Sequence, residues 1–154
     1  MRTIQTDEGL AVVTNFGNIP VIITEKARIY IPWQGIEELL KYLKLAVAYA
    51  RDPTLATMIQ EALTKNMREL RTELGTVPAL RLEALAQIEQ LLDKYRRRTN
   101  LDTQQLIILH AIMELLQRYR TGIQQLEMPA LLYLARQQAK RNLIKMQEEI
   151  LRSL

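Results

Sequence analysis

The sequence has no cysteine, and His110 is its only histidine. Disulfide bonds, thiolate metal sites and cysteine nucleophiles are therefore excluded. No second histidine is present to complete a metal site, and His110 sits in an apolar helical segment, so we interpret it as a core or interface residue. Short motifs typical of phosphate-binding loops, nucleophile elbows and zinc proteases are also absent. We expect no catalytic residue, no metal site and no cofactor, and thus a protein that is not an enzyme.

Long apolar runs are missing as well, since none approaches the roughly 18 residues of a membrane span. Asp7 and Glu8 precede the first apolar stretch, which does not fit a signal peptide. We therefore predict a cytoplasmic protein that has no membrane partner. The lack of cysteine, together with abundant Arg, Glu and Leu, is typical of proteins from hot-living organisms.

The excess of basic charge is small, because 21 Lys and Arg residues against 17 Asp and Glu residues give a formal net charge of +4. Basic side chains gain free energy on nucleic acid by releasing phosphate counterions. Most of them can instead pair with acidic side chains on helix faces. The one basic run, Arg96 to Arg98 after Tyr95, is typical of the solvated C-terminal end of a helix.

Glycine and proline are few, and only Gly122 and Pro129 lie beyond Pro78. Before Pro32 the apolar residues alternate and are rich in β-branched types, which predicts short strands joined by turns. These strands would form a small antiparallel sheet that needs a cover from elsewhere. The expected strands span residues 10–14, 21–24 and 27–31, with a further edge strand at 2–5.

After Trp33 the apolar residues follow helical spacing, which predicts a series of long helices. Asp52-Pro53, Gly75, Pro78 and Asp102 supply the expected start and stop signals. We predict an α+β, mostly α fold with a small antiparallel β module in residues 1–33, then a helical bundle of about five helices in residues 34–154. The apolar stripes of these helices run through residues 36–50, 55–74, 80–95, 106–119 and 132–150.

One helix carries apolar side chains in several directions, at residues 106–109, so it must be surrounded by its own chain or by a partner. The aromatic residues of the β module could pack the sheet against a helix or stack on bases. Candidate residues for a partner interface or for packing of the β module are Phe16, Tyr30, Trp33, Leu106, Leu109, Ile112 and Leu116. Candidate nucleic-acid contacts, in the alternative interpretation, are Lys26, Arg28, Arg96, Arg97 and Arg98.

Three segments of the β module resemble the GINS family as a unit. They are VVTNF at residues 12–16, IPVII at 19–23 and IYIPW at 29–33. In subunits of the Psf-two and Psf-three type, similar segments form a strand end, a second strand and the entry into the first helix. Thr14 stands where that family has proline, and Gly35 is followed by Ile36 in place of the usual small residue.

The remainder is similar to that family in layout, with a leucine-rich helix to Tyr95, a polar turn at residues 99–102 and a helix that runs to Arg120. The resemblance implies an archaeal GINS subunit that forms a two-plus-two heterotetramer with a sister subunit. It also implies binding to the replicative MCM helicase and to a RecJ-like replisome partner, stimulation of unwinding, and at most indirect contact with DNA. Two alternatives remain: a single-stranded DNA-binding protein that uses a small β platform, and an archaeal viral coat or nucleoid protein.

Overall fold

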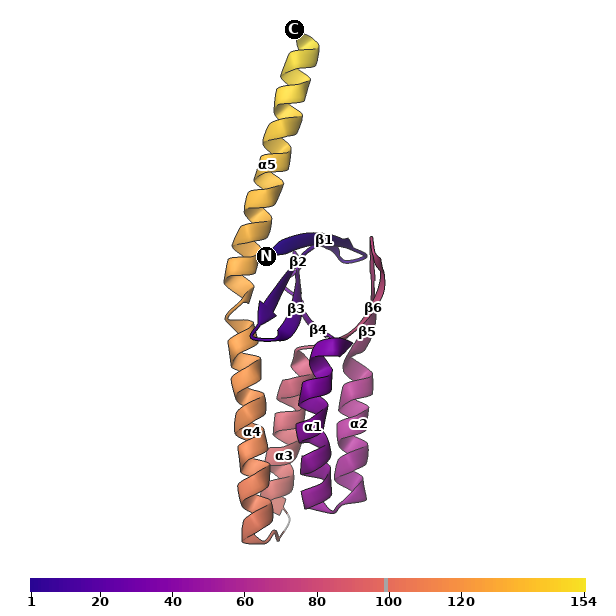
Figure 1. The fold of residues 1–154 in the computed structure, drawn as a ribbon, viewed down its shortest axis with the longest axis vertical. Coiled ribbons are helices and arrows are strands. Elements are labelled where there is room, and N and C mark those ends of the chain that lie inside the picture. Colours follow the sequence, from indigo (N-terminus) through magenta and orange to yellow (C-terminus); the bar gives the residue numbers. More distant parts are fainter. Residues whose placement is uncertain (99) are drawn as a thin grey trace.

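The computed structural model describes residues 1–98 and 100–154 and shows an α+β protein, mostly helical, that begins with antiparallel strands (Figure 1). The predicted fold class is thus confirmed at this level. Thr99, in the predicted polar turn, lies outside the described residues. The elements are β1 (Arg2–Thr6), β2 (Gly9–Phe16), β3 (Ile19–Thr24), β4 (Ile29–Pro32), α1 (Trp33–Ala50), α2 (Pro53–Asn66), β5 (Met67–Thr72), β6 (Gly75–Arg81), α3 (Glu83–Arg98), α4 (Thr103–Gln124) and α5 (Glu127–Ser153).

The described strands close into an antiparallel barrel in the order β1-β2-β3-β4-β6-β5. The hairpin β5–β6 completes it, with Tyr30 of β4 opposite Arg81 of β6. Our prediction of helix for residues 67–74 and 78–82 was therefore wrong. The helical domain predicted for residues 34–154 contributes two strands to the barrel.

Gly75 explains the incorrect helix prediction. It is the first residue of β6, directly after the hairpin turn, and has a φ of +122°, a backbone conformation that side-chain-bearing residues rarely adopt. In the sequence, the same glycine fits the end of a helix equally well. Leu70 and Leu74, which precede Gly75, are four residues apart, a spacing that a helix also allows. The exposed charges Glu69 and Arg71 follow the two-residue period of a strand.

Alternate residues of the strands face the barrel interior and the helices. Ile4, Ala11, Ile22, Tyr30 and Leu70 belong to the small cluster inside the barrel. Their neighbours on the outer face join the larger core that extends into the helices. The barrel thus has an apolar filling of its own, and the helices cover one side of it.

Helices α1, α2, α3 and α4 form the bundle beneath the barrel, whereas α5 leaves it and runs up past the strands (Figure 1). The predicted bundle of about five helices is corrected on this point. Asp102 caps α4 as expected, in a reciprocal pair of hydrogen bonds with Gln105. Gly122 neither ends nor interrupts α4, which continues to Gln124.

Helix α5 divides into two unlike parts. Its first part packs on β2 and β3, where Ala130 and Leu134 are buried. Gln138 still reaches the barrel, because its Nε2 donates a hydrogen bond to Glu25 Oε2 at 2.9 Å. Residues 138–154 are all exposed to solvent, and in Figure 1 this part projects well beyond the strands.

Candidate interaction surfaces

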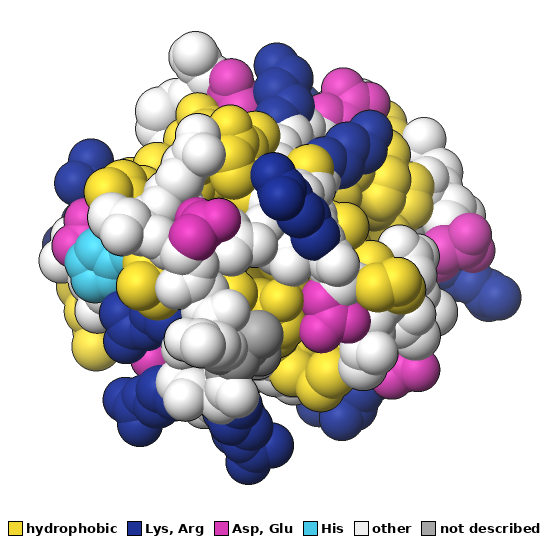
Figure 2. Space-filling model, turned by 90° about the horizontal axis from the view of Figure 1, so that it is seen from below, with side chains coloured by type: hydrophobic (Ala, Val, Ile, Leu, Met, Phe, Trp, Pro, Cys, Tyr) yellow, Lys and Arg dark blue, Asp and Glu magenta, His cyan; other side chains and the backbone are white. Residues whose placement is uncertain are grey.

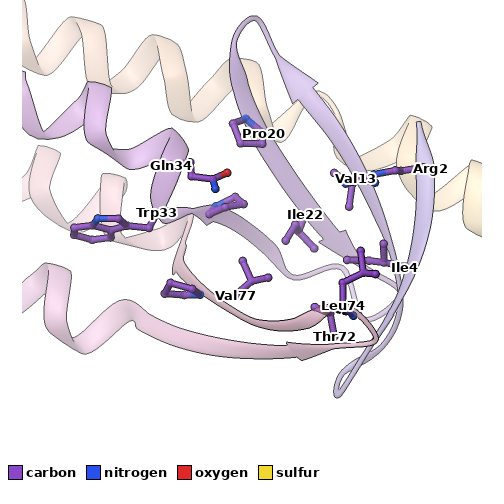
Figure 3. A pocket seen from close by; sticks show the side chains of 12 residues that line it. Arg2, Ile4, Val13, Pro20, Ile22, Trp33, Gln34, Thr72, Leu74 and Val77 are labelled. Atoms are coloured by element: carbon purple, nitrogen blue, oxygen red, sulfur yellow. Dashed lines mark hydrogen bonds between the residues drawn. The ribbon is translucent and has the colours of Figure 1, made fainter.

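The open mouth of the barrel is the first candidate surface. A cavity of about 250 Å³ lies there, lined mainly by apolar side chains of the strands such as Ile4, Val13, Ile22 and Val77 (Figure 3). Trp33, at the start of α1, also lines it and is 38% exposed. The cavity is small and apolar, and Arg2 is its one charged lining residue.

The mouth stays open because β1 extends beyond the β5–β6 hairpin. Along the described strands, β1 meets β5 at a single register pair, Thr6 with Thr72. The Asp7 N–H donates to the Arg71 carbonyl at 2.9 Å, and the Glu73 N–H donates to the Gln5 carbonyl at 3.2 Å. The first residues of β1 therefore lie past the turn of the hairpin.

Ion pairs hold the β1–β2 turn against β5 at the other end of the barrel. The Glu8 carboxylate is only 4% exposed and pairs with Arg28 and with Arg68, whose Nη1 lies 2.7 Å from Glu8 Oε2. Arg68 Nη2 also pairs with Asp7 Oδ2 at 2.9 Å. These contacts tie the β1–β2 turn to the turn before β4 and to β5.

The electrostatics of this ion-pair cluster favour a charged Glu8. Burial by itself would raise the pKa of the Glu8 carboxyl, but hydrogen bonds with Tyr30 and Arg28 and the charge of Arg68 outweigh it and lower that pKa. Burial, followed by the hydrogen bond to Glu8, raises the pKa of the Tyr30 hydroxyl. The cluster helps to close the barrel, and it was not predicted from the sequence because its members lie far apart in the chain.

Projecting helix α5 provides the second candidate surface. Large apolar side chains that are each more than half exposed follow one another along it: Met128, Leu132, Leu143, Ile144, Met146, Ile150 and Leu151. Scattered exposed apolar residues are ordinary, but a contiguous row of them marks an interaction site. The signal was present in the sequence as a helical stripe, but only the structure shows that the described part of the chain leaves it uncovered.

Most of the predicted interface residues serve the chain's own core. Leu109, Ile112 and Leu116 are buried in the bundle and cannot face a partner unless the bundle opens, so their assignment to a partner interface was wrong. The reason is that α4 packs against both α1 and α3. The prediction that this helix is surrounded at residues 106–109 holds on one side only. Leu109 is covered by the same chain, whereas Ile107 is 64% exposed.

The aromatic residues predicted to pack the β module or to stack on bases lie in different surroundings. Tyr30 is 1% exposed inside the barrel, so it packs the β module and cannot stack on bases. Phe16 is half-buried, with its ring edge-on to Tyr119 of α4 at a centroid distance of 6.1 Å. Trp33 and Leu106 remain at the surface, each 38% exposed.

The predicted nucleic-acid residues lie in two separate places. Lys26 and Arg28 belong to the turn before β4, beside the start of α3. Arg96 and its two neighbours lie at the far end of α3, roughly 20 Å away by the rise of a helix. Figure 2, which views the molecule from below, shows basic side chains scattered among acidic and apolar ones.

Several of these cations are already paired. Arg28 binds Glu8, and Arg96 and Arg97 both bind Asp93, at 2.9 and 3.1 Å. His110 is 55% exposed, with Glu114 at 3.1 Å, so it is not a core residue, and of our interpretation as a core or interface residue only the interface role stays a prediction. It lies on the outer side of α4, near Arg96.

Metal-ligand clusters and membrane-spanning helices are absent from the described part of the chain. Among residues 1–98 and 100–154, no group of three or more His, Asp or Glu residues could hold a metal ion. Within the same ranges, no helix is both long enough and apolar enough to cross a membrane. Comparisons with protein-family models, curated proteins and solved structures find no match to this chain. The features that remain are a small barrel on a helical bundle and a projecting helix with an uncovered apolar stripe.

Proposed function

We propose that this protein is a non-enzymatic assembly subunit that acts by binding other protein chains. The observation that carries this proposal is the row of exposed apolar side chains on α5, which continues where the barrel no longer covers the helix. Removing such side chains from water stabilises a complex by roughly 25 cal/mol for each Å² buried. A partner chain that covers the stripe would supply this stabilisation.

The complex we infer is a GINS-type DNA replication complex of an archaeon, with this chain as a Psf-two or Psf-three type subunit. The three segments that resemble the family lie in neighbouring elements of one unit: in β2, in β3 and across the junction of β4 with α1. This continuity supports the proposal, because the resemblance covers a contiguous piece of structure. The chain would then join a sister subunit in a two-plus-two heterotetramer in the cytoplasm, associated with the nucleoid.

In that complex the protein would scaffold and stimulate the replicative MCM helicase and contact a RecJ-like partner. Its contribution would be protein binding, and any effect on DNA would be indirect. The separation of Arg28 from the Arg96 region favours this over the single-strand-binding alternative, which needs cations and aromatic rings on one surface.

Co-expression with a sister subunit from the same organism tests this proposal. We expect a stable heterotetramer that accelerates unwinding of forked DNA by the MCM helicase, while neither subunit alone has this effect. The helicase alone and the helicase with an unrelated helical protein serve as controls. Failure of the two chains to co-purify, or a complex that leaves unwinding unchanged, would contradict the proposal.

A further inference from the structure

We propose that the exposed part of α5 pairs antiparallel with α5 of a second copy of this chain. The inference rests on the proposed role of this stripe in assembly and names the partner and its orientation. The contact would be formed by Ala139, Leu143, Met146 and Ile150, with Ile144 and Leu151 at its margin.

The four central positions form a narrow stripe. With about 100° of rotation per residue, they fall within an arc of about 60° on the helix surface. The three large ones are 59%, 56% and 57% exposed, in the order Leu143, Met146 and Ile150. A narrow stripe of this kind fits the surface of one other helix.

The stripe faces away from the barrel. Leu134, which is buried against the strands, precedes Leu143 by nine positions, or about two and a half helical turns. The two leucines therefore lie on opposite sides of α5. A partner helix can run along the stripe without meeting β2 or β3, so the barrel does not obstruct pairing.

The spacing of the stripe is the same in both chain directions. Its members are separated by four, three and four residues, so an antiparallel copy places Ala139 opposite Ile150 and Leu143 opposite Met146. In each outer layer the small Ala139 faces the large Ile150. In the middle layers Leu143 of one chain faces Met146 of the other. Layers of this kind fill the space between two helices evenly.

Charges along α5 also favour the antiparallel orientation. The segment before the centre is basic, with Arg136, Lys140, Arg141 and Lys145, and the acidic residues Glu148 and Glu149 follow it. An antiparallel copy brings Lys140 and Arg141 alongside the two glutamates of its partner. A parallel copy would place like charges beside each other, and its helix dipoles would also be aligned.

The contact is modest in extent. Residues 138–153 span about 24 Å of helix, which places a two-helix contact at the lower end of stable interfaces. We therefore expect a dimer that dissociates on dilution. Sedimentation of the full chain over a range of concentrations should show the mass rise from 17.9 kDa towards twice that value.

Charge introduced into the stripe tests which surface pairs. Leu143→Glu combined with Ile150→Glu should weaken dimerisation at least tenfold, because each carboxylate would enter an apolar layer. Arg152→Glu, on the opposite face of the same helix, is the matched control and should leave dimerisation within about twofold. Equal loss in both variants, or none in the double variant, would overturn the assignment of the stripe.

Engineered cysteines test the orientation, and the absence of native cysteine makes the experiment clean. In the antiparallel pair two Ala139 positions lie about 16 Å apart along the axis, beyond the reach of a disulfide. Ala139→Cys and Ile150→Cys should therefore each fail to cross-link alone and should cross-link when mixed. Cross-linking of each variant with itself would show a parallel pair and overturn the proposal.

The outcomes separate this inference from the proposed function. A wild-type chain that stays monomeric at every concentration overturns self-pairing, while the sister-subunit experiment still decides the proposed role. A dimer with the expected cross-links but no association with a sister subunit would support this inference and contradict membership of the proposed heterotetramer.

Discussion

Both parts of α5 carry apolar side chains at helical spacing, but their surroundings differ. In the first part, Leu134 is buried against the barrel, whereas Leu143 in the second part is more than half exposed. Both lie on one continuous helix, so helical periodicity alone does not distinguish them. The comparison teaches that an apolar stripe becomes core or interface according to what the rest of the chain can cover.

The largest expected effect comes from the matched leucines themselves. Leu134→Ala should lower the free energy of unfolding by about 2–5 kcal/mol, because it removes a buried side chain and leaves a cavity. Leu143→Ala should change monomer stability by less than about 0.5 kcal/mol, because its side chain is mostly hydrated. Urea denaturation at a dilution where the chain is monomeric measures both, and equal losses would refute the comparison.

A smaller effect concerns the closed end of the barrel. Glu8→Gln should lower the free energy of unfolding by about 1–3 kcal/mol at neutral pH, because it removes the charge of a buried carboxylate that pairs with Arg28 and Arg68. The control is Glu61→Gln, which changes an exposed carboxylate on α2.

The pH dependence of Glu8 gives a second readout. Its pKa is lower in the folded protein than in the unfolded chain, so its contribution is complete above the unfolded value and is lost as the pH falls through the folded value. The wild type should therefore lose more stability on acidification than Glu8→Gln does. Denaturation curves between neutral and acid pH measure this, and parallel losses would contradict the role given to Glu8.

Removal of residues 142–154 should affect stability still less. Every residue of the deleted segment is exposed, so the midpoint of thermal unfolding of the monomer should move by no more than about 2 °C. The same deletion should abolish dimerisation. Scanning calorimetry and sedimentation of the truncated chain check both points, and a large loss of stability would show that the body of the protein depends on this segment.

The smallest expected change is in the emission of Trp33, the only tryptophan of the chain. Trp33 is the first residue of α1 and lines the barrel mouth, where none of the described lining residues belongs to α5. Its emission maximum should therefore stay constant while concentration drives dimerisation through α5. A shift that follows the dimer fraction would instead place the barrel mouth in the contact.

Much of the local structure could be predicted from the sequence, but few of the contacts between segments that lie far apart in the chain. The alternating residues before Pro32 form strands, and Asp102 caps a helix as expected. Residues 67–74 and 78–82 were mistaken for helix, because the strand character of β5 and β6 depends on pairing with β1 and β4. The alternating charges of β5 are a local signal of a strand, but the leucine spacing fits a helix as well, and only the long-range pairing decides between the two.

The candidate surfaces were predictable only in part. The apolar stripe of α5 is visible as helical spacing, but which leucines face the barrel depends on where β2 and β3 lie. Leu109 and Leu116 have the same kind of spacing and are core. The Glu8 cluster brings together residues from separate turns and strands, and each of them looks like an ordinary surface charge in the sequence.

The central claim is that another protein chain covers the exposed stripe of α5. Hydrogen exchange of the backbone amides of residues 143–150 tests it most directly, because a projecting helical end without a partner frays easily. We predict that these amides exchange slowly at high protein concentration and much faster on dilution or in the double glutamate variant. Fast exchange at every concentration, in the chain alone and with a sister subunit, would contradict the claim.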